Sequence, residues 1–89
     1  MPQANTPIDV ICMCSAGGEI RPLRFRMEDE DHQLLRVDID EIINVRKIQY
    51  VGIEAAVYLC RVAAAGSEWL VELKYTIRSH SWCLLRRIY

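Results

Sequence analysis

The chain has 89 residues, which is the size of one domain and leaves no room for a second. Hydrophobic residues make up 52% of the sequence and charged residues 26%, an ordinary balance for a folded chain that excludes extensive disorder. The formal net charge of −1 excludes a strong general attraction to nucleic acid or to anionic membranes, so any such binding must be local.

The sequence also indicates where the protein works. Its longest apolar runs, residues 55–60 and 62–65, are far shorter than the ~20 residues of a membrane helix. The first ten residues, MPQANTPIDV, do not show the basic segment and long apolar core of a secretory signal. We therefore expect no membrane association, a cytoplasmic location and four reduced cysteines.

The N-terminal third predicts a leader followed by a β-hairpin. Residues 1–7 contain two prolines and no apolar period, so we expect a flexible leader before a single domain of residues 8–89. Residues 8–15 are mostly β-branched or apolar and run into Ala16-Gly17-Gly18-Glu19, a pattern typical of a strand and a tight turn.

The next strand shows a clean period of two. In residues 20–28, IRPLRFRME, the side chains of Leu23, Phe25 and Met27 are expected on one face and the arginines on the other. Pro22 has no amide hydrogen, which favours a sheet edge or a bulge at that position.

The middle of the chain alternates between polar and apolar segments. Residues 28–33, EDEDHQ, predict a solvated hairpin tip, and the alternation that follows predicts a third strand from Leu34 to about Ile39. Asp40–Ile48 fits a strand or one helical turn, and its Ile, Val and Asn content favours the strand.

The C-terminal half predicts three more segments. Residues 55–65 favour a fourth strand ended by Gly66-Ser67, with a helix as the competing interpretation because of the alanines. Residues 68–78 alternate clearly, with Trp69 and Tyr75 on the apolar face, and residues 82–89 form a last short strand after a polar turn. The chain is therefore expected to be all-β, with five or six mostly antiparallel strands closed into a small barrel.

Part of the sequence resembles a known family. The order GGEIRPLRF, a charged loop, then LRVDIDEIINVRK is similar to the SH3-like or Sm-like barrel of WYL-type domains, with the matching residues Gly18, Arg21, Pro22, Arg36 and Asp38. Asp40 stands where that family has an isoleucine, and the Trp-Tyr-Leu tripeptide is missing. The resemblance implies a small barrel that binds a ligand or nucleic acid and performs no chemistry.

Two cysteines near the N-terminus raise the question of a metal or redox site. Cys12 and Cys14 share one face of the first strand, because side chains alternate along a strand. Their spacing is closer than the usual zinc-binding Cys pair, and the other potential ligands are distant in sequence. We therefore expect two buried hydrophobic thiols and no metal or cofactor.

A catalyst is the rival hypothesis from another class. A thiol- or metal-dependent site would use Cys12, Cys14 and His80, or Cys83 with His80. No residue is marked out to orient the imidazole of His80, so we expect no enzymatic activity.

An arginine row is the most suggestive feature for binding. Arg21, Arg24 and Arg26 lie on or beside the outward side of the second strand, and Arg36 lies on the third. Such a row could hold phosphate or a carboxylate, whereas Asp38 and Asp40 could instead neutralise it across the strands.

These observations predict a non-enzymatic binding or adaptor module. The alternatives are a module that binds nucleic acid or another anionic ligand through the arginine row, and the thiol- or metal-dependent catalyst. The partner could be a protein or a nucleic acid, and a homo-oligomer is possible because open sheet edges pair readily.

Overall fold

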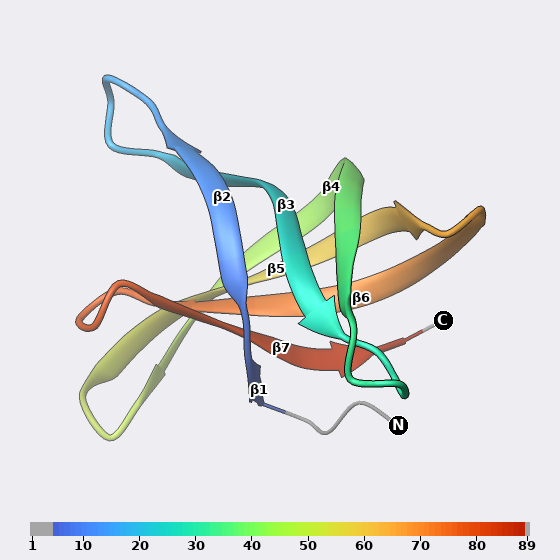
Figure 1. Ribbon diagram of the computed structural model, residues 1–89. Coiled ribbons are helices and arrows are strands. Elements are labelled where there is room, and N and C mark those ends of the chain that lie inside the picture. The colour runs from blue at the N-terminus through green and yellow to red at the C-terminus, as the bar shows by residue number, and fades with distance from the viewer. Residues whose placement is uncertain (1–4, 89) are drawn as a thin grey trace.

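The structure is a computed structural model that describes residues 5–88, and all of its regular structure is β (Figure 1). The expected all-β architecture is therefore confirmed. The expected count of five or six strands is wrong, since the described residues form seven. They are β1 (Thr6–Pro7), β2 (Asp9–Cys14), β3 (Ile20–Glu28), β4 (Leu34–Tyr50), β5 (Ile53–Ala64), β6 (Ser67–Thr76) and β7 (Ser81–Arg87).

The strands form one antiparallel sheet in the order β1-β7-β6-β5-β4-β3-β2. β1 and β2 are separated only by Ile8, yet β1 pairs with β7 and β2 pairs with β3 at the opposite end of the sheet. The amide of Ile8 also donates a hydrogen bond to the carbonyl of Trp82, at 3.3 Å. The sheet therefore curls strongly into a half-barrel (Figure 1), and the single strand expected near the N-terminus becomes two.

The expected leader, residues 1–7, lies partly outside the described residues. Its last two residues form β1, so ordered structure begins before Ile8. Among residues 5–88 no helix of the length and hydrophobicity needed to span a membrane occurs.

β4 joins two segments that the sequence suggested separately. It runs for 17 residues and is interrupted by two bulges, which leave Asp40 and Ile43 without a register partner on β5. Each bulge bends the strand, so β4 turns away from β3. Its pairing with β3 ends at Asp38, whereas its pairing with β5 continues to Tyr50.

β5 lies in the middle of the sheet, between β4 and β6, which excludes the helical interpretation of residues 55–65. Ala55 and Val57 on one face and Ala56 and Tyr58 on the other are all buried. A strand covered on both faces lacks the polar alternation that usually identifies one, which explains the ambiguity.

The hydrophobic core fills the concave side of the curled sheet. It is formed by Phe25, Val37, Ala56, Tyr58, Cys60, Val62, Ala64, Val71, Leu73, Tyr75, Trp82 and Leu84. At its centre the ring of Trp82 lies 5.3 Å from that of Tyr58 and 4.8 Å from that of Tyr75. The hydroxyl of Tyr58 donates a 2.7 Å hydrogen bond to the carbonyl of Ile20, which ties β5 to β3 across the core.

A bulge in the β2–β3 hairpin corrects one expectation from the sequence. Arg24 pairs with Ile11 and Pro22 with Cys12, so Leu23 is the extra residue. Pro22 is fully buried, whereas the side chain of Leu23 is exposed, contrary to the simple alternation of residues 20–28. The expectation of a bulge or an edge at Pro22 is confirmed.

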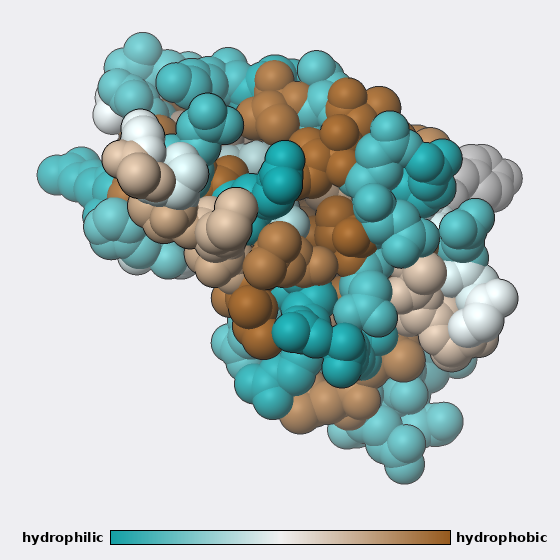
Figure 2. All heavy atoms as spheres, turned by 90° about the horizontal axis from the view of Figure 1, so that it is seen from above, coloured by the Kyte–Doolittle hydropathy of each residue, from teal (hydrophilic) through white to brown (hydrophobic). Residues whose placement is uncertain are grey.

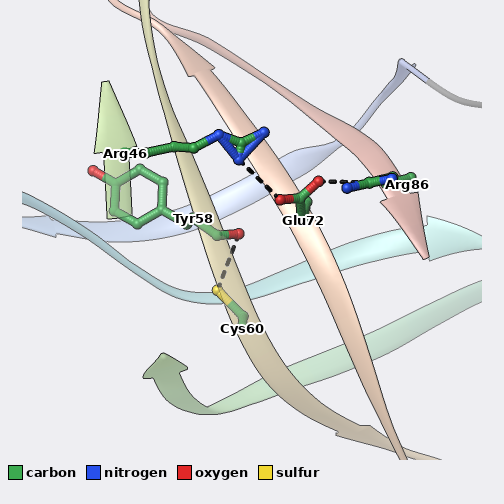
Figure 3. Close-up of polar contacts among 5 residues, drawn as sticks. All are labelled: Arg46, Tyr58, Cys60, Glu72 and Arg86. Atoms are coloured by element: carbon green, nitrogen blue, oxygen red, sulfur yellow. Dashed lines mark hydrogen bonds and ion pairs between the residues drawn. The ribbon is translucent and has the colours of Figure 1, made fainter. Parts of the chain in front are cut away.

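The convex face carries a buried carboxylate held by two arginines (Figure 3). The side chain of Glu72 on β6 is only 6% exposed. It accepts a hydrogen bond from Arg46 of β4 at 3.1 Å and another from Arg86 of β7 at 2.6 Å. This network links three strands, and both arginines reach water at their other side.

Candidate functional site

One end of the half-barrel is hollow. A cavity of about 560 Å³ opens there between the β3–β4 turn and the ends of β6 and β7. Its floor is apolar and continuous with the core, being formed by Phe25, Met27, Leu35, Val71 and Leu84. Sites that enclose small ligands typically have volumes in this range.

The β3–β4 turn forms an acidic wall of this cavity, with Glu28, Asp29 and Glu30 among the lining residues. Asp29 fixes the turn, because its Oδ1 accepts 2.9 Å hydrogen bonds from the amides of Asp31 and Gln33. The side chain of Glu30 has no ion pair or hydrogen bond with any of residues 5–88. Its carboxylate is therefore available to a ligand.

His32 belongs to the same wall. Its Nδ1 lies 3.0 Å from a carboxylate oxygen of Glu28, and this hydrogen bond raises the pKa of His32 above its usual value. The backbone of His32 has a φ of 62°, a left-handed conformation that closes the turn.

The opposite wall combines an indole with a guanidinium. Trp69 is half-buried, and the guanidinium carbon of Arg87 lies 4.6 Å from the centre of its ring. This cation–π contact places the guanidinium over one face of the indole. Three carboxylates, one guanidinium and the imidazole of His32 thus surround an apolar floor, and the rim keeps a net negative charge even when His32 is protonated.

Three of the four arginines of the expected row lie together. Arg24, Arg26 and Arg36 line a smaller hollow of about 330 Å³ on the outer side of β2, β3 and β4. Arg26 forms a 2.7 Å ion pair with Asp9, and Arg36 a 3.1 Å ion pair with Asp38.

Arg24 and Arg21, the other two arginines of the row, differ from Arg26 and Arg36 in their contacts and position. Among residues 5–88 Arg24 has no ion pair. Arg21 lies farther along β3, opposite Met13, and does not line the hollow.

The expectation that Cys12 and Cys14 are buried is wrong. Both are exposed, and they lie on the part of β2 that pairs with β3 beyond the end of the β3–β4 pairing. Cys60 is the cysteine that behaves as a core residue, and burial raises the pKa of its thiol to about 12. Burial also raises the pKa of the Cys83 thiol.

The rates at which the four cysteine thiols react should follow their exposure. At pH 8 we expect an aromatic disulfide reagent to modify Cys12 and Cys14 within the first fast phase, because thiolate fraction and access set the rate. Cys83 should react more slowly, and Cys60 only when the protein unfolds. Mass spectrometry of the labelled peptides at successive times measures this order; early labelling of Cys60 would contradict the burial described here.

The residues of the hypothetical catalytic site do not form a cluster. His80 lies in the β6–β7 turn with its Nδ1 2.8 Å from the hydroxyl of Tyr75. No group of three or more His, Cys, Asp or Glu side chains within residues 5–88 is arranged to hold a metal ion, and this includes Cys12, Cys14 and His80.

The sequence interpretation missed the hollow end. Trp69 packs against the core and residues 28–33 form a mostly exposed hairpin turn, as expected, yet Trp69 and the acidic turn also line this cavity, and no role was predicted for Arg87. The available signal was a run of acidic residues between two alternating strands, which puts carboxylates at the rim of whatever those strands enclose.

Comparisons with protein-family models, with curated proteins and with solved structures each gave no match.

Proposed function

We propose that the protein is a non-enzymatic binding module whose site is the hollow end of the half-barrel. The ligand class is an apolar body that carries a cationic group, as in an aryl-alkyl amine or a lysine or arginine side chain of a partner protein. The observation that carries this proposal is the combination of an apolar floor with the acidic turn of Glu28, Asp29 and Glu30.

Physical chemistry supports this choice of ligand. Burying an apolar group on the floor contributes about 25 cal/mol per Å² of area removed from water. A carboxylate at the edge of a low-dielectric cavity attracts a cation more strongly than it would in bulk water. Glu30 can turn toward a ligand without breaking a contact inside the described chain.

Three narrower expectations are part of the same proposal. The assignment to an SH3-like or Sm-like barrel, with the WYL-type resemblance, is supported by the all-β half-barrel and by the pairing of β1 and β2 with opposite edges. An adaptor role for a protein partner and a cytoplasmic location follow from the sequence arguments above.

A set of matched small molecules tests the site. We expect 4-phenylbutylammonium to bind with a dissociation constant on the order of a few millimolar, given about 0.3 kcal/mol per heavy atom. An alcohol or a carboxylate with the same phenylbutyl group should bind more weakly than the ammonium compound. For the carboxylate, the dissociation constant should be at least about threefold higher than that of the ammonium compound. Trp69 provides the signal, since its fluorescence should change on binding while the buried Trp82 stays unaffected.

Two variants, each with a control, test whether the compounds bind in the hollow end of the half-barrel. Leu35→Trp should abolish binding by filling the cavity, whereas Leu23→Trp, at an exposed position elsewhere, should leave it unchanged. Glu30→Gln should weaken the ammonium compound and leave the alcohol unaffected, whereas Glu54→Gln should change neither. Equal affinity for all three compounds, or a tightly binding Leu35→Trp protein, would overturn the proposal.

The arginine hollow supports a second candidate function, the binding of an anionic ligand or of nucleic acid phosphate. The favouring observation is that Arg24, which has no ion pair among residues 5–88, lines this hollow with Arg26 and Arg36. The same compounds separate the two candidates. Preferential binding of the carboxylate, lost in Arg24→Ala and reduced by salt, would favour this second function.

A further inference from the structure

One long strand edge has no partner within the described chain. β4 pairs with β3 only over Leu34–Asp38, and no described strand pairs with the remaining part, residues 39–50, on the side away from β5. We refer to that side of residues 39–50 as the open β4 edge. Unpaired amide and carbonyl groups along such an edge form a template for another strand.

Apolar side chains accompany the open β4 edge. Ile43, Val45, Ile48 and Tyr50 are each at least 37% exposed, with Tyr50 at 78%. Figure 2, which looks down on the bend of β4, shows hydrophobic side chains at the surface beside hydrophilic ones. An edge strand with exposed apolar side chains gains both hydrogen bonds and apolar burial when a second strand pairs with it.

The distribution of charge on β4 identifies the second strand. Asp40 and Glu41 lie at one end of the open β4 edge, and Arg46 and Lys47 lie toward the other. Within the chain Glu41 pairs with Arg61 and Arg46 with Glu72, so Asp40 and Lys47 are the charges left for a partner. An antiparallel copy of the same strand would place the acidic end of one chain beside the basic end of the other. A formal net charge of −1 per chain opposes this association very little.

Because of the second bulge, the residues that would lie opposite each other in the two copies point to the same face of the strand. Glu41 pairs with Arg61 and Arg46 with Val57, two residues four apart on β5, so Glu41 and Arg46 share the convex face. Ile42 pairs with Cys60 and Val45 with Tyr58, so Ile42 and Val45 share the concave face.

In a regular strand Glu41 and Arg46, five residues apart, would point to opposite faces. The extra residue Ile43 shifts the alternation by one and brings them to the same face. An antiparallel copy centred on Ile43 and Asn44 therefore places Glu41 opposite Arg46, and Ile42 opposite Val45.

We propose that two copies of this chain associate through the open β4 edge, antiparallel about a twofold axis near Ile43 and Asn44. The partner is a second copy because the edge is complementary to itself in charge and in apolar positions. Asp40 and Lys47, which have no ion pair among residues 5–88, then approach each other across the axis. Association is independent of the hollow end of the half-barrel.

Charge reversal at the two unpaired positions tests this interface. We expect the unaltered protein to show a concentration-dependent monomer–dimer equilibrium by sedimentation equilibrium under reducing conditions. Asp40→Lys and Lys47→Asp should each raise the dimer dissociation constant by at least about tenfold, because like charges then face each other. The Asp40→Lys/Lys47→Asp double variant should restore the dimer, because the opposite charges are exchanged.

Matched controls separate this effect from a general change of charge. Asp31→Lys in the β3–β4 turn and Arg78→Asp in the β6–β7 turn make the same charge changes away from β4 and should leave the dimer intact. Hydrogen exchange should show that those amides of residues 42–46 that point away from β5 gain protection with protein concentration. A protein that stays monomeric up to millimolar concentration, or a dimer unaffected by the β4 substitutions, would overturn the proposal.

Discussion

Trp82→Ala is expected to lower the free energy of unfolding by about 3–5 kcal/mol, the usual cost of removing a large buried aromatic side chain. Trp82 is 8% exposed and packs between Tyr58 and Tyr75, so its removal opens a cavity and breaks two ring contacts. A domain of this length has a total stability of only about 5–13 kcal/mol. The substitution therefore removes a large part of what keeps the chain folded.

Urea denaturation followed by far-ultraviolet circular dichroism measures this loss. Trp69→Ala is the matched control, because Trp69 is half-buried at the wall of the hollow end. It should cost about 1–2 kcal/mol while weakening the binding of the ammonium compound. A Trp82→Ala protein as stable as Trp69→Ala would show that the three aromatic rings do not form the centre of the core.

Tyr58→Phe tests the hydrogen bond that the Tyr58 hydroxyl makes at the centre of the core. The hydroxyl of Tyr58 is the donor to the carbonyl of Ile20, and burial raises the pKa of that hydroxyl. The phenylalanine keeps the ring contact with Trp82 and removes only the hydrogen bond. The Ile20 carbonyl then loses this donor, and the link between β5 and β3 depends on ring packing alone.

The sequence allowed the prediction of strands wherever one face meets the core and the other meets water. In β6, Val71, Leu73 and Tyr75 alternate with more polar residues, and the structure buries all three. Glu72 on the other face departs from this pattern, because Arg46 and Arg86 cover its carboxylate. In β3 the same alternation holds for Phe25 and Met27 and fails at Leu23, because a bulge inserts one extra residue. Side-chain period is a local property, so it predicts strands and does not locate bulges.

The point at which a strand stops pairing with its neighbour was beyond the reach of the sequence. The exposure of Cys12 and Cys14 depends on where β4 leaves β3, and that point is set by bulges at Asp40 and Ile43. Nothing within the β2 sequence distinguishes a covered from an uncovered strand.

The same reasoning applies to the hollow end. The acidic turn of residues 28–33 was correctly predicted as a hairpin connection, whereas its position over a cavity depends on β6 and β7, which are distant in sequence. The row predicted from two adjacent strands included Arg21, Arg24, Arg26 and Arg36, and only the last three line one hollow. Their partial neutralisation by Asp9 required knowledge of the β2–β3 register.

The buried carboxylate of Glu72 provides the second large effect. Arg46→Met and Arg86→Met are each expected to lower the free energy of unfolding by about 1 kcal/mol, because the carboxylate keeps one guanidinium partner in either variant. The double variant should lose about 3 kcal/mol, more than the sum, since a charge shielded from water is then left without a partner. Urea denaturation of the four proteins of this double-mutant cycle measures the coupling.

The triple variant Arg46→Met/Arg86→Met/Glu72→Leu tests whether apolar side chains can replace the ion network without loss of stability. An apolar side chain should recover most of the stability lost in the double variant, because replacing a complete buried ion network by apolar groups of similar volume is often neutral. Arg61→Met is the control: it removes an ion pair with Glu41 in which both side chains are about half exposed, and it should cost less than about 1 kcal/mol. If the double variant were no less stable than the Arg61→Met control, water would already solvate Glu72 in the folded protein. The link between β4, β6 and β7 would then rest on backbone hydrogen bonds and packing alone.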